Sequence, residues 1–237
     1  MANAGYFLRQ SKFGVRDGNM MRLFYFGALL LLVAGTARTA ETFKQQLAEL
    51  EAKLAAEPTN TTILFKLGDL CHDEGARDNA KAVELAEKYF KQLLALEPTN
   101  AFAMALLGSA LTMRARDAFW PKTRLDYVKK GIKMMDAAVQ LAPEDPDVRL
   151  VRAINGFHMP KFMEREEIAK ADFAWLWQRV ETKPEVLKND LKQNGALFYG
   201  QILKKQKRMK EAIEVWKKGI AFDPESDLAR EIRQQLK

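Results

Sequence analysis

The 237-residue chain contains one cysteine, Cys71, and only two histidines, His72 and His158. A single cysteine excludes an intramolecular disulfide. Neither histidine has a second histidine or a cysteine at zinc-ligand spacing, and the chain has no glycine-rich phosphate loop and no nucleophile-elbow motif. We therefore predict a protein that is not an enzyme and has no catalytic residues, no metal site and no cofactor.

Runs of the strand-favouring residues Val, Ile and Thr are scarce, whereas Leu, Ala, Lys and Glu are abundant, which favours helix. The 38 Lys and Arg residues exceed the 31 Asp and Glu residues, which gives a formal net charge of +7. Residues 1–37 carry four basic residues and one acidic residue, so the rest of the chain has a net charge of +4. That excess is too small to indicate a nucleic-acid partner, and no recognisable nucleic-acid module accompanies it.

The N-terminal segment has the composition of an export signal. Residues 23–37 are apolar and uncharged, and they follow Arg22. This run is too short for a transmembrane helix, which needs about 20 residues, but it suits the core of a signal peptide. We predict that residues 1–37 form a signal peptide cleaved after Ala37, with Met21 as an alternative start. The chain is then exported to a periplasmic or extracytoplasmic location; the alternative is an uncleaved N-terminal segment that anchors it.

Proline recurs with a period of about forty residues, which is typical of helical repeats. Five prolines follow helical patterns and are spaced by 40, 45, 41 and 40 residues. Because proline cannot continue a helix, each one marks the end of a repeated unit. Four of the five are followed by Thr, Asn, Asp or Ser, which can cap the next helix. The prolines are Pro58, Pro98, Pro143, Pro184 and Pro224.

Within a unit the apolar pattern predicts two helices. In the last full unit one apolar stripe covers residues 196–203 and another covers residues 209–220, both at helical spacing. Gly200 and Ala212 lie where two antiparallel helices would cross. The pattern Ala-x2-Tyr-Gly-x2-Leu from Ala196, followed by Ala-x3-Trp-x2-Gly-x4-Pro from Ala212, resembles the tetratricopeptide repeat, whose usual length is about 34 residues. The earlier units match in part.

The resemblance implies an all-α fold, an α-solenoid of about four tetratricopeptide-like helix pairs with additional terminal helices. We predict a linker and an opening helix in residues 38–60. The repeats then cover residues 61–225. A C-terminal capping helix occupies residues 226–237, with the polar face that the end of a solenoid requires.

Two features depart from the family pattern. In the third unit Arg149 and Arg152 replace apolar residues, and the second helix fits the pattern poorly around Asp172. We therefore predict that this unit packs poorly. The first two units are also longer than the last, by about six and eleven residues. We predict that this surplus extends the loop between the two helices of each unit.

The tetratricopeptide-repeat family packs the first helices of its repeats along a concave groove, which commonly receives a peptide or a helix. The resemblance implies a mixed apolar and polar surface there. The family's chaperone-binding members carry Lys, Asn and Arg at clamp positions, where this chain has Phe65, Asp69 and Ala105. We therefore exclude that subtype. The candidate groove residues are Phe65, Asp69, Phe102, Ser109 and Phe157.

The turns inside the units form a second candidate surface, because such turns lie along one edge of a solenoid. They carry basic and aromatic side chains, which suit a binding surface. We predict that this edge binds an acidic protein surface or an anionic membrane face. The alternative is that Phe119 and Trp120 fold back onto the core and the lysines only keep the surface soluble. The candidate residues are Arg116, Phe119, Trp120, Lys122, Arg124, Lys161 and Phe162.

These features predict a non-catalytic protein–protein interaction scaffold or adaptor in the cell envelope that assists the assembly of a complex. One alternative is an accessory subunit of a membrane transport or secretion machine, docked through the basic and aromatic edge. An unrecognised enzyme is a third hypothesis, which substrate turnover by the purified protein alone would support.

Overall fold

The computed structural model describes residues 29–237, with side chains from residue 42 onward. Our predictions for the first part of the signal peptide and for a start at Met21 lie outside the described residues. In the described part, ten α-helices and two short 3-10 helices follow one another without a strand, as the all-α prediction requires. The elements are α1 (Leu29–Ala56), α2 (Thr61–Gly75), α3 (Ala80–Leu96), α4 (Ala101–Asp117), α5 (Pro121–Leu141), α6 (Pro146–His158), η2 (Lys161–Met163), α7 (Glu166–Thr182), η3 (Pro184–Val186), α8 (Asn189–Lys205), α9 (Met209–Phe222) and α10 (Asp227–Gln235).

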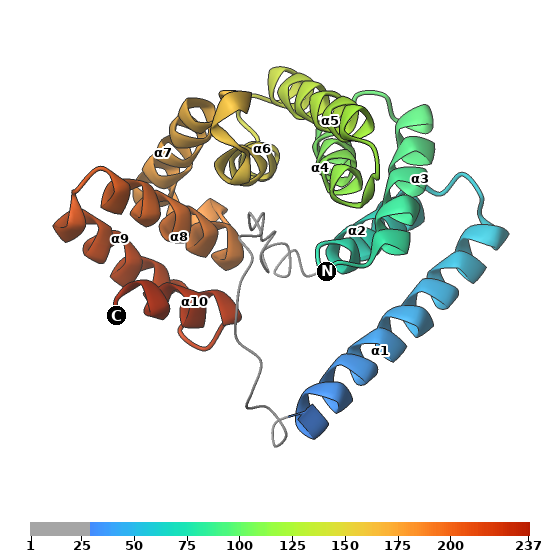
Figure 1. The fold of residues 1–237 in the computed structure, drawn as a ribbon, viewed down its shortest axis with the longest axis horizontal. Coiled ribbons are helices and arrows are strands. Elements are labelled where there is room, and N and C mark those ends of the chain that lie inside the picture. The colour runs from blue at the N-terminus through green and yellow to red at the C-terminus, as the bar shows by residue number, and fades with distance from the viewer. Residues whose placement is uncertain (1–28) are drawn as a thin grey trace.

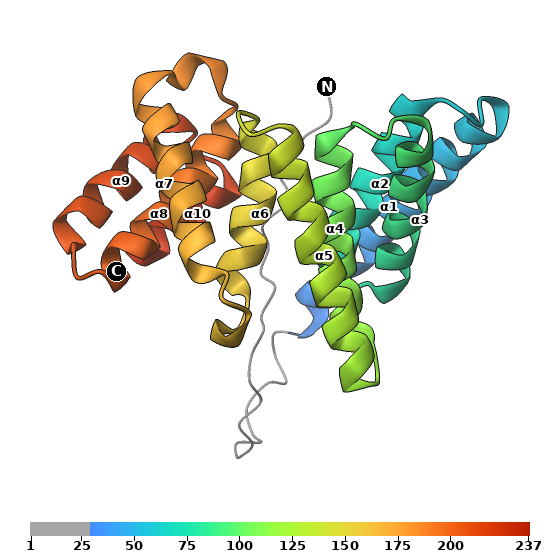
Figure 2. The same cartoon turned by 90° about the horizontal axis from the view of Figure 1, so that it is seen from above.

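Consecutive helices pack as pairs, namely α2 with α3, α4 with α5, α6 with α7 and α8 with α9. The pairs follow one another around an arc (Figure 1), with α2, α4, α6 and α8 on its inner side and their partners on the outer side. The turned view shows the pairs side by side along the solenoid (Figure 2). The predicted α-solenoid of four helix pairs is therefore confirmed.

The apolar stripes of the pairs meet in two clusters of buried side chains. One cluster lies among α2 to α6 and includes Phe90 and Met135, and the other lies among α6 to α10 and includes Phe173 and Trp216. Each helix pair is too small to bury its apolar face alone, so stacking of neighbours completes the core. Cys71 is buried in the first cluster, where burial raises the pKa of its thiol to about 12.

Polar side chains after the repeat prolines cap the first helices of the units. The Oδ1 atoms of Asn60 and Asn100 accept hydrogen bonds from backbone amides three residues later, at 3.1 and 3.0 Å. Asp145 does the same at the start of α6, and Ser226 does so at the start of α10. Such caps satisfy amides that have no partner within the helix. The sequence-based prediction of these four helix starts is confirmed.

Small residues let the helices of a pair approach closely. At the crossing of α8 and α9, a Cβ atom added to Gly200 would lie 2.2 Å from Nε1 of Trp216. The indole of Trp216 is buried there and donates a hydrogen bond to the carbonyl oxygen of Leu197 at 3.2 Å. The glycine therefore makes room for the tryptophan within one unit.

The surplus length of the early units lies in the helices, so our prediction of extended loops is wrong. The second helices α3 and α5 have 17 and 21 residues, against 14 in α9. The turn between α4 and α5 consists only of residues 118–120. Pro121 stands at the first position of α5, where a proline starts a helix instead of ending it. The basic residues around this turn therefore lie in helices, with Arg114 and Arg116 in α4 and Lys122 and Arg124 in α5.

The two ends of the solenoid are also helical. The opening helix α1 begins inside the predicted signal peptide, continues past Ala37 and ends at Ala56. Helix α10 occupies the place predicted for the capping helix, and its buried residues Leu228 and Ile232 face the last pair. Among the helices described, none combines the length and the apolar character needed to cross a membrane.

Candidate partner-binding site

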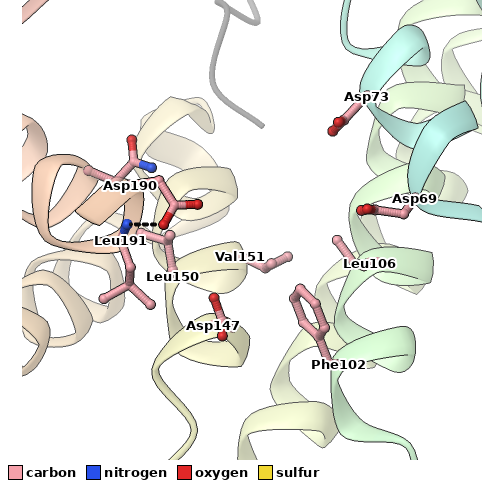
Figure 3. A pocket seen from close by; sticks show the side chains of 10 residues that line it. Asp69, Asp73, Phe102, Leu106, Asp147, Leu150, Val151, Asp190 and Leu191 are labelled. Atoms are coloured by element: carbon pink, nitrogen blue, oxygen red, sulfur yellow. Dashed lines mark hydrogen bonds between the residues drawn. The ribbon is translucent and has the colours of Figure 1, made fainter. Parts of the chain in front are cut away.

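The inner faces of the four first helices form one pocket. Its walls come from α2, α4, α6 and α8, and it is open to solvent. Figure 3 shows Asp69 and Asp73 on one side of the pocket and Asp147 and Asp190 on the other. Apolar side chains form one part of the lining, namely Phe102, Leu106, Leu150, Val151 and Leu191, and the rest is Asp69, Asp73, Asp147, Asp190 and Asn194.

Four carboxylates therefore face the pocket from three helices. Asp69 and Asp73 are one helical turn apart on α2, a spacing at which like charges repel. Asp147 and Asp190 lie in the first turns of α6 and α8, where the helix dipole favours negative charge. Lys188 pairs with Asp147 at 3.7 Å. Among the residues described, the other three carboxylates make no ion pair within 4 Å, which leaves the pocket acidic.

Burial makes these negative charges costly. It raises the pKa of Asp69 to about 6, against the opposing effect of Lys188. The pKa of Asp73 rises to about 7, because burial and the neighbouring Asp69 outweigh the effect of Arg77. Burial also raises the pKa of Asp147. A cation brought into the pocket would favour the ionised forms.

An amide oxygen in the same pocket has no partner. The side chain of Asn194 on α8 is 3% exposed and lines the pocket. Its Oδ1 atom is buried and makes no hydrogen bond within the described part of the structure. A buried acceptor without a donor costs about 1–3 kcal/mol. The pocket thus presents carboxylates and one unsatisfied amide oxygen.

The carboxylates are spread along the groove. Within residues 42–237, no three His, Cys, Asp or Glu side chains come together closely enough to hold a metal ion. The arrangement can instead accept several hydrogen bonds from donors distributed over a larger ligand.

Only part of the predicted groove set reaches this pocket. Asp69 and Phe102 line it. Phe65 is half-buried and packs on Phe102, with ring centroids 5.6 Å apart. Phe157 is half-buried in an aromatic cluster with Phe173 and Phe198, at 6.1 and 5.2 Å. These two rings therefore support the inner face by packing.

Ser109 is not a groove contact, contrary to our prediction. It is buried, and its hydroxyl is already engaged. The hydroxyl oxygen lies 2.9 Å from Nε2 of His72 and accepts a hydrogen bond from Nδ2 of Asn155 at 3.2 Å. Burial lowers the pKa of His72 to about 3, so its ring is neutral. Ser109 belongs to a polar contact that joins α2, α4 and α6 beneath the surface.

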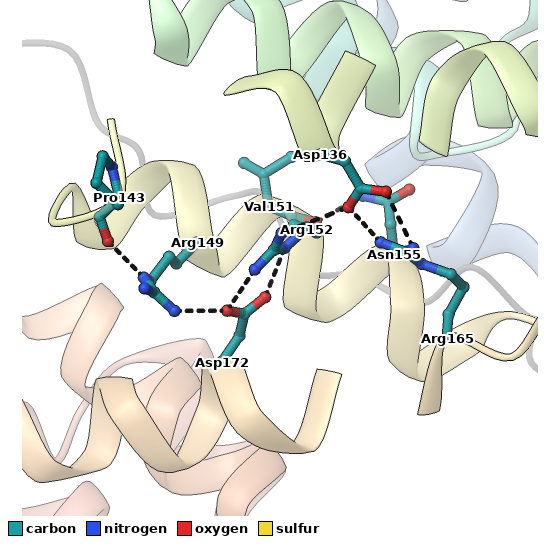
Figure 4. Close-up of polar contacts among 8 residues, drawn as sticks. All are labelled: Asp136, Pro143, Arg149, Val151, Arg152, Asn155, Arg165 and Asp172. Carbon is teal, nitrogen blue, oxygen red and sulfur yellow. Dashed lines mark hydrogen bonds and ion pairs between the residues drawn. The ribbon is translucent and has the colours of Figure 1, made fainter. Parts of the chain in front are cut away.

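The charged residues of the third unit are paired, so our prediction of poor packing there is wrong. Asp172 on α7 is 1% exposed and accepts hydrogen bonds from Arg149 at 2.9 Å and from Arg152 at 2.8 Å through two donors (Figure 4). Arg152 also contacts Asp136, which pairs with Arg165. The polar residues replace an apolar contact between α6 and α7 with an ion-pair network. Arg149, Arg152 and Asp172 each depart from the family pattern, but their opposite charges compensate one another.

The predicted aromatic residues of the within-unit turns are exposed. Phe119 and Trp120 in the α4–α5 turn are 81% and 67% exposed, and Phe162 in η2 is 76% exposed. The rings of Phe119 and Trp120 contact each other edge to face, with centroids 5.0 Å apart. The alternative that these two rings fold onto the core is therefore wrong. The α4–α5 turn and η2 lie at the same edge of the solenoid (Figure 2). We call Phe119, Trp120, Lys122, Lys161 and Phe162 the aromatic rim.

The basic residues near the aromatic rim divide into two groups. Arg116 pairs with Asp78 at 2.7 Å and donates to the carbonyl oxygen of Gly75 at 3.2 Å. Arg124 donates to the carbonyl oxygen of Ala118 at 2.6 Å. These two arginines hold the turns together. Lys122 and Lys161, the two lysines of the aromatic rim, are exposed.

We did not predict Asp73, Asp147, Asp190 or Asn194 from the sequence. Asp73 had a usable signal, since it lies four residues after Asp69 and so on the same helix face. Asp147 and Asp190 had the ordinary signature of acidic residues in a first helical turn. Only the stacking of the pairs brings them together.

Parts of this chain are similar to known proteins. A family model described as tetratricopeptide repeat matches residues 196–226. Among solved structures, TTC0263, a thermophilic TPR protein in Thermus thermophilus, is similar with a TM-score of 0.61 and 16% identity, over 87% of this chain and 96% of that one. The crystal structure of MamA matches with a TM-score of 0.47 and 20% identity, over 80% of this chain and 93% of that one. No curated protein matches the sequence.

Proposed function

We propose that this chain, which carries a tetratricopeptide repeat in α8 and α9 and has the fold of a tetratricopeptide-repeat solenoid, is a non-catalytic scaffold that assists the assembly of a protein complex in the cell envelope. Proteins with this repeat generally serve as scaffolds for protein–protein interactions. The envelope location rests on the sequence of residues 1–37, which has the composition of an export signal.

The single observation that carries this proposal is the exposure of the aromatic rim. Three large rings, those of Phe119, Trp120 and Phe162, are exposed to water, and the turn and the 3-10 helix that carry them lie at one edge of the solenoid. Leaving such rings exposed forgoes about 1.5–3 kcal/mol of burial for each side chain. Aromatic residues are enriched among the few residues that dominate protein interfaces. The rim therefore suits a partner that covers these rings.

The charge next to these rings indicates the chemistry of that partner. Lys122 and Lys161 are exposed beside the aromatic side chains. An acidic protein surface would pair with the lysines at the edge of the contact while the rings fill its centre. A membrane transport or secretion machine with such a surface would recruit the chain as an accessory subunit through the same rim.

Affinity capture from the native envelope fraction tests the proposal. We expect the wild-type chain to retain a defined set of proteins, identified by mass spectrometry, and the triple variant F119S/W120S/F162S to lose them. Val186→Ser is the matched control, because Val186 is 67% exposed but lies in η3, between two units. Equal capture by the wild type and the triple variant would contradict a role for the rim. Cell fractionation of the tagged chain tests the envelope location.

A further inference from the structure

We propose that the concave pocket of α2, α4, α6 and α8 binds a cationic segment of a partner protein, with Lys or Arg side chains of that segment against Asp69, Asp73 and Asp147. This inference rests on the proposed scaffold function, to which it adds a second surface and a partner chemistry. It concerns the inner face of the solenoid, whereas the aromatic rim lies at one edge.

The polar atoms of the pocket define what the ligand must supply. Carboxylates accept hydrogen bonds only, and the unsatisfied atom of the buried Asn194 is its Oδ1, also an acceptor. A complementary ligand therefore presents donors without acceptors. Lys ammonium and Arg guanidinium groups are the protein side chains with this property, and their hydrogen bonds to carboxylates are roughly twice as strong as neutral ones.

The charge of the pocket is not neutralised from within. Lys188 is the one cation that forms an ion pair with a pocket carboxylate among the residues described, and it contacts Asp147 at 3.7 Å with a largely exposed side chain. Asp69 and Asp73, one turn apart on α2, carry the costlier charges. A bound cation near these two carboxylates would relieve both their repulsion and their desolvation.

The spread of the acceptors indicates a polypeptide segment in preference to a metal ion. The carboxylates come from three helices. Within the described residues, no three of these carboxylates are close enough together to share a metal ion. Several donors along a chain can reach them. The apolar lining from Phe102, Leu106 and Leu150 suits the aliphatic stems of Lys and Arg or an apolar neighbour in the segment. A segment with basic and apolar residues interleaved fits both parts of the pocket.

Peptide binding to the full chain tests this inference directly. The probe is a fluorescein-labelled peptide of about twelve residues in which Arg alternates with Leu and Ser, titrated by fluorescence anisotropy at low salt, about 50 mM. Matched peptides carry Gln or Glu in place of every Arg. We expect the Arg peptide to bind at least about tenfold more tightly than the Gln peptide, and the Glu peptide not to bind.

A charge-matched pair of variants locates the contact. The groove variant is D69N/D73N/D147N, and the control is D126N/E185Q/E225Q, which removes three exposed carboxylates outside the pocket. We expect the groove variant to lose at least about tenfold in affinity for the Arg peptide and the control to lose less than about threefold. Amide shifts of isotope-labelled protein, followed by NMR, should concentrate on the inner faces of α2, α6 and α8.

Binding that is equal for the Arg and Gln peptides, or that survives unchanged in the groove variant, would overturn the inference. So would shifts confined to the outer helices. These outcomes leave the scaffold proposal standing if native envelope proteins are still captured through the aromatic rim. If F119S/W120S/F162S no longer captures native envelope proteins but still binds the Arg peptide, the aromatic rim and the concave pocket are independent binding surfaces.

Discussion

Gly108 on α4 and Gly131 on α5 face each other where the two helices cross. A Cβ atom added to Gly108 would lie 2.7 Å from the carbonyl oxygen of Gly131, and one added to Gly131 would lie 2.5 Å from the carbonyl oxygen of Gly108. Both obstructing atoms belong to the backbone, so a rotamer change cannot relieve the clash. The longest helix pair of the solenoid is thus held by backbone contact that only two glycines permit.

We expect Gly108→Ala to lower the free energy of unfolding by about 1–3 kcal/mol, because the helices must move apart. Urea denaturation followed by circular dichroism measures the change. Gly195→Ala is the matched control, since the nearest atom to its added Cβ, Val180 Cγ2, lies at 3.9 Å in ordinary contact. There the gain in helix propensity should leave stability equal or raise it by up to about 1 kcal/mol. If Gly108→Ala lowered the free energy of unfolding no more than Gly195→Ala does, the crossing of α4 and α5 would not be tight.

The buried carboxylate of Asp172 provides a second test. Asp172→Ala leaves Arg149 and Arg152, whose side chains are 18% and 16% exposed, without their shared partner. We expect a loss of about 3–5 kcal/mol in the free energy of unfolding, since breaking a buried pair leaves an uncompensated charge. Glu181→Gln removes the exposed pair with Lys218 and should change stability by less than about 1 kcal/mol. If the two substitutions have the same small effect, the network does not hold α6 against α7.

Stability should depend on pH through the pocket carboxylates. The folded-state pKa values of Asp69 and Asp73, about 6 and about 7, lie above the unfolded value of about 3.9. The folded state therefore binds more protons, and this contribution to stability is fully present below about pH 4 and is lost as the pH rises through 6 and 7. Lys188 opposes the rise in the pKa of Asp69, and Arg77 opposes the rise in the pKa of Asp73, but burial outweighs both.

Substituting both carboxylates isolates this effect. We expect D69N/D73N to be more stable than the wild type by about 1–2 kcal/mol at about pH 8 and to lose this advantage at about pH 5, because the wild-type carboxyls are then largely protonated. Urea denaturation at the two pH values measures both differences. A gap between the two proteins that does not change with pH would contradict the raised pKa values. If D69N/D73N is more stable than the wild type and also binds the Arg peptide more weakly, then these carboxylates lower the stability of the fold and serve binding.

The exposed rings of the aromatic rim should contribute little to folding. We expect F119S/W120S to change the free energy of unfolding by less than about 0.5 kcal/mol, because neither ring is buried. Trp216→Ala, which removes the buried indole over Gly200, should cost about 3–5 kcal/mol. A large destabilisation by F119S/W120S in thermal and urea unfolding would mean that the rings pack in solution and are not free for a partner.

Local signals in the sequence predicted most of the fold. The repeat prolines, the capping residues after them and the Gly200–Ala212 spacing act within a few residues or within one helix pair, so they can be read along the chain. The length of α5 could not be read in this way, because Pro121 ends a helix or starts one depending on what precedes it.

The missed features depend on contacts between units. Arg149 and Arg152 looked unfavourable one at a time, and only the packing of α6 on α7 shows that Asp172 pairs with both. The pocket likewise combines Asp69 and Asp147, which are far apart in the sequence, through the stacking of first helices. The place of the rings of the aromatic rim at one edge of the solenoid could be predicted, because within-unit turns of a solenoid share an edge. Their exposure could not, because folding of Phe119 and Trp120 back onto the core was an open alternative.

Site-specific photo-crosslinking in the native cell asks whether the chain is a scaffold that holds another protein at its aromatic rim. A photoreactive phenylalanine analogue replaces Trp120 in one strain and Val186, the equally exposed residue of η3, in another. We predict a covalent adduct with a distinct envelope protein from position 120 and none from position 186. No adduct at position 120, or the same adducts from both positions, would contradict the scaffold role of the rim.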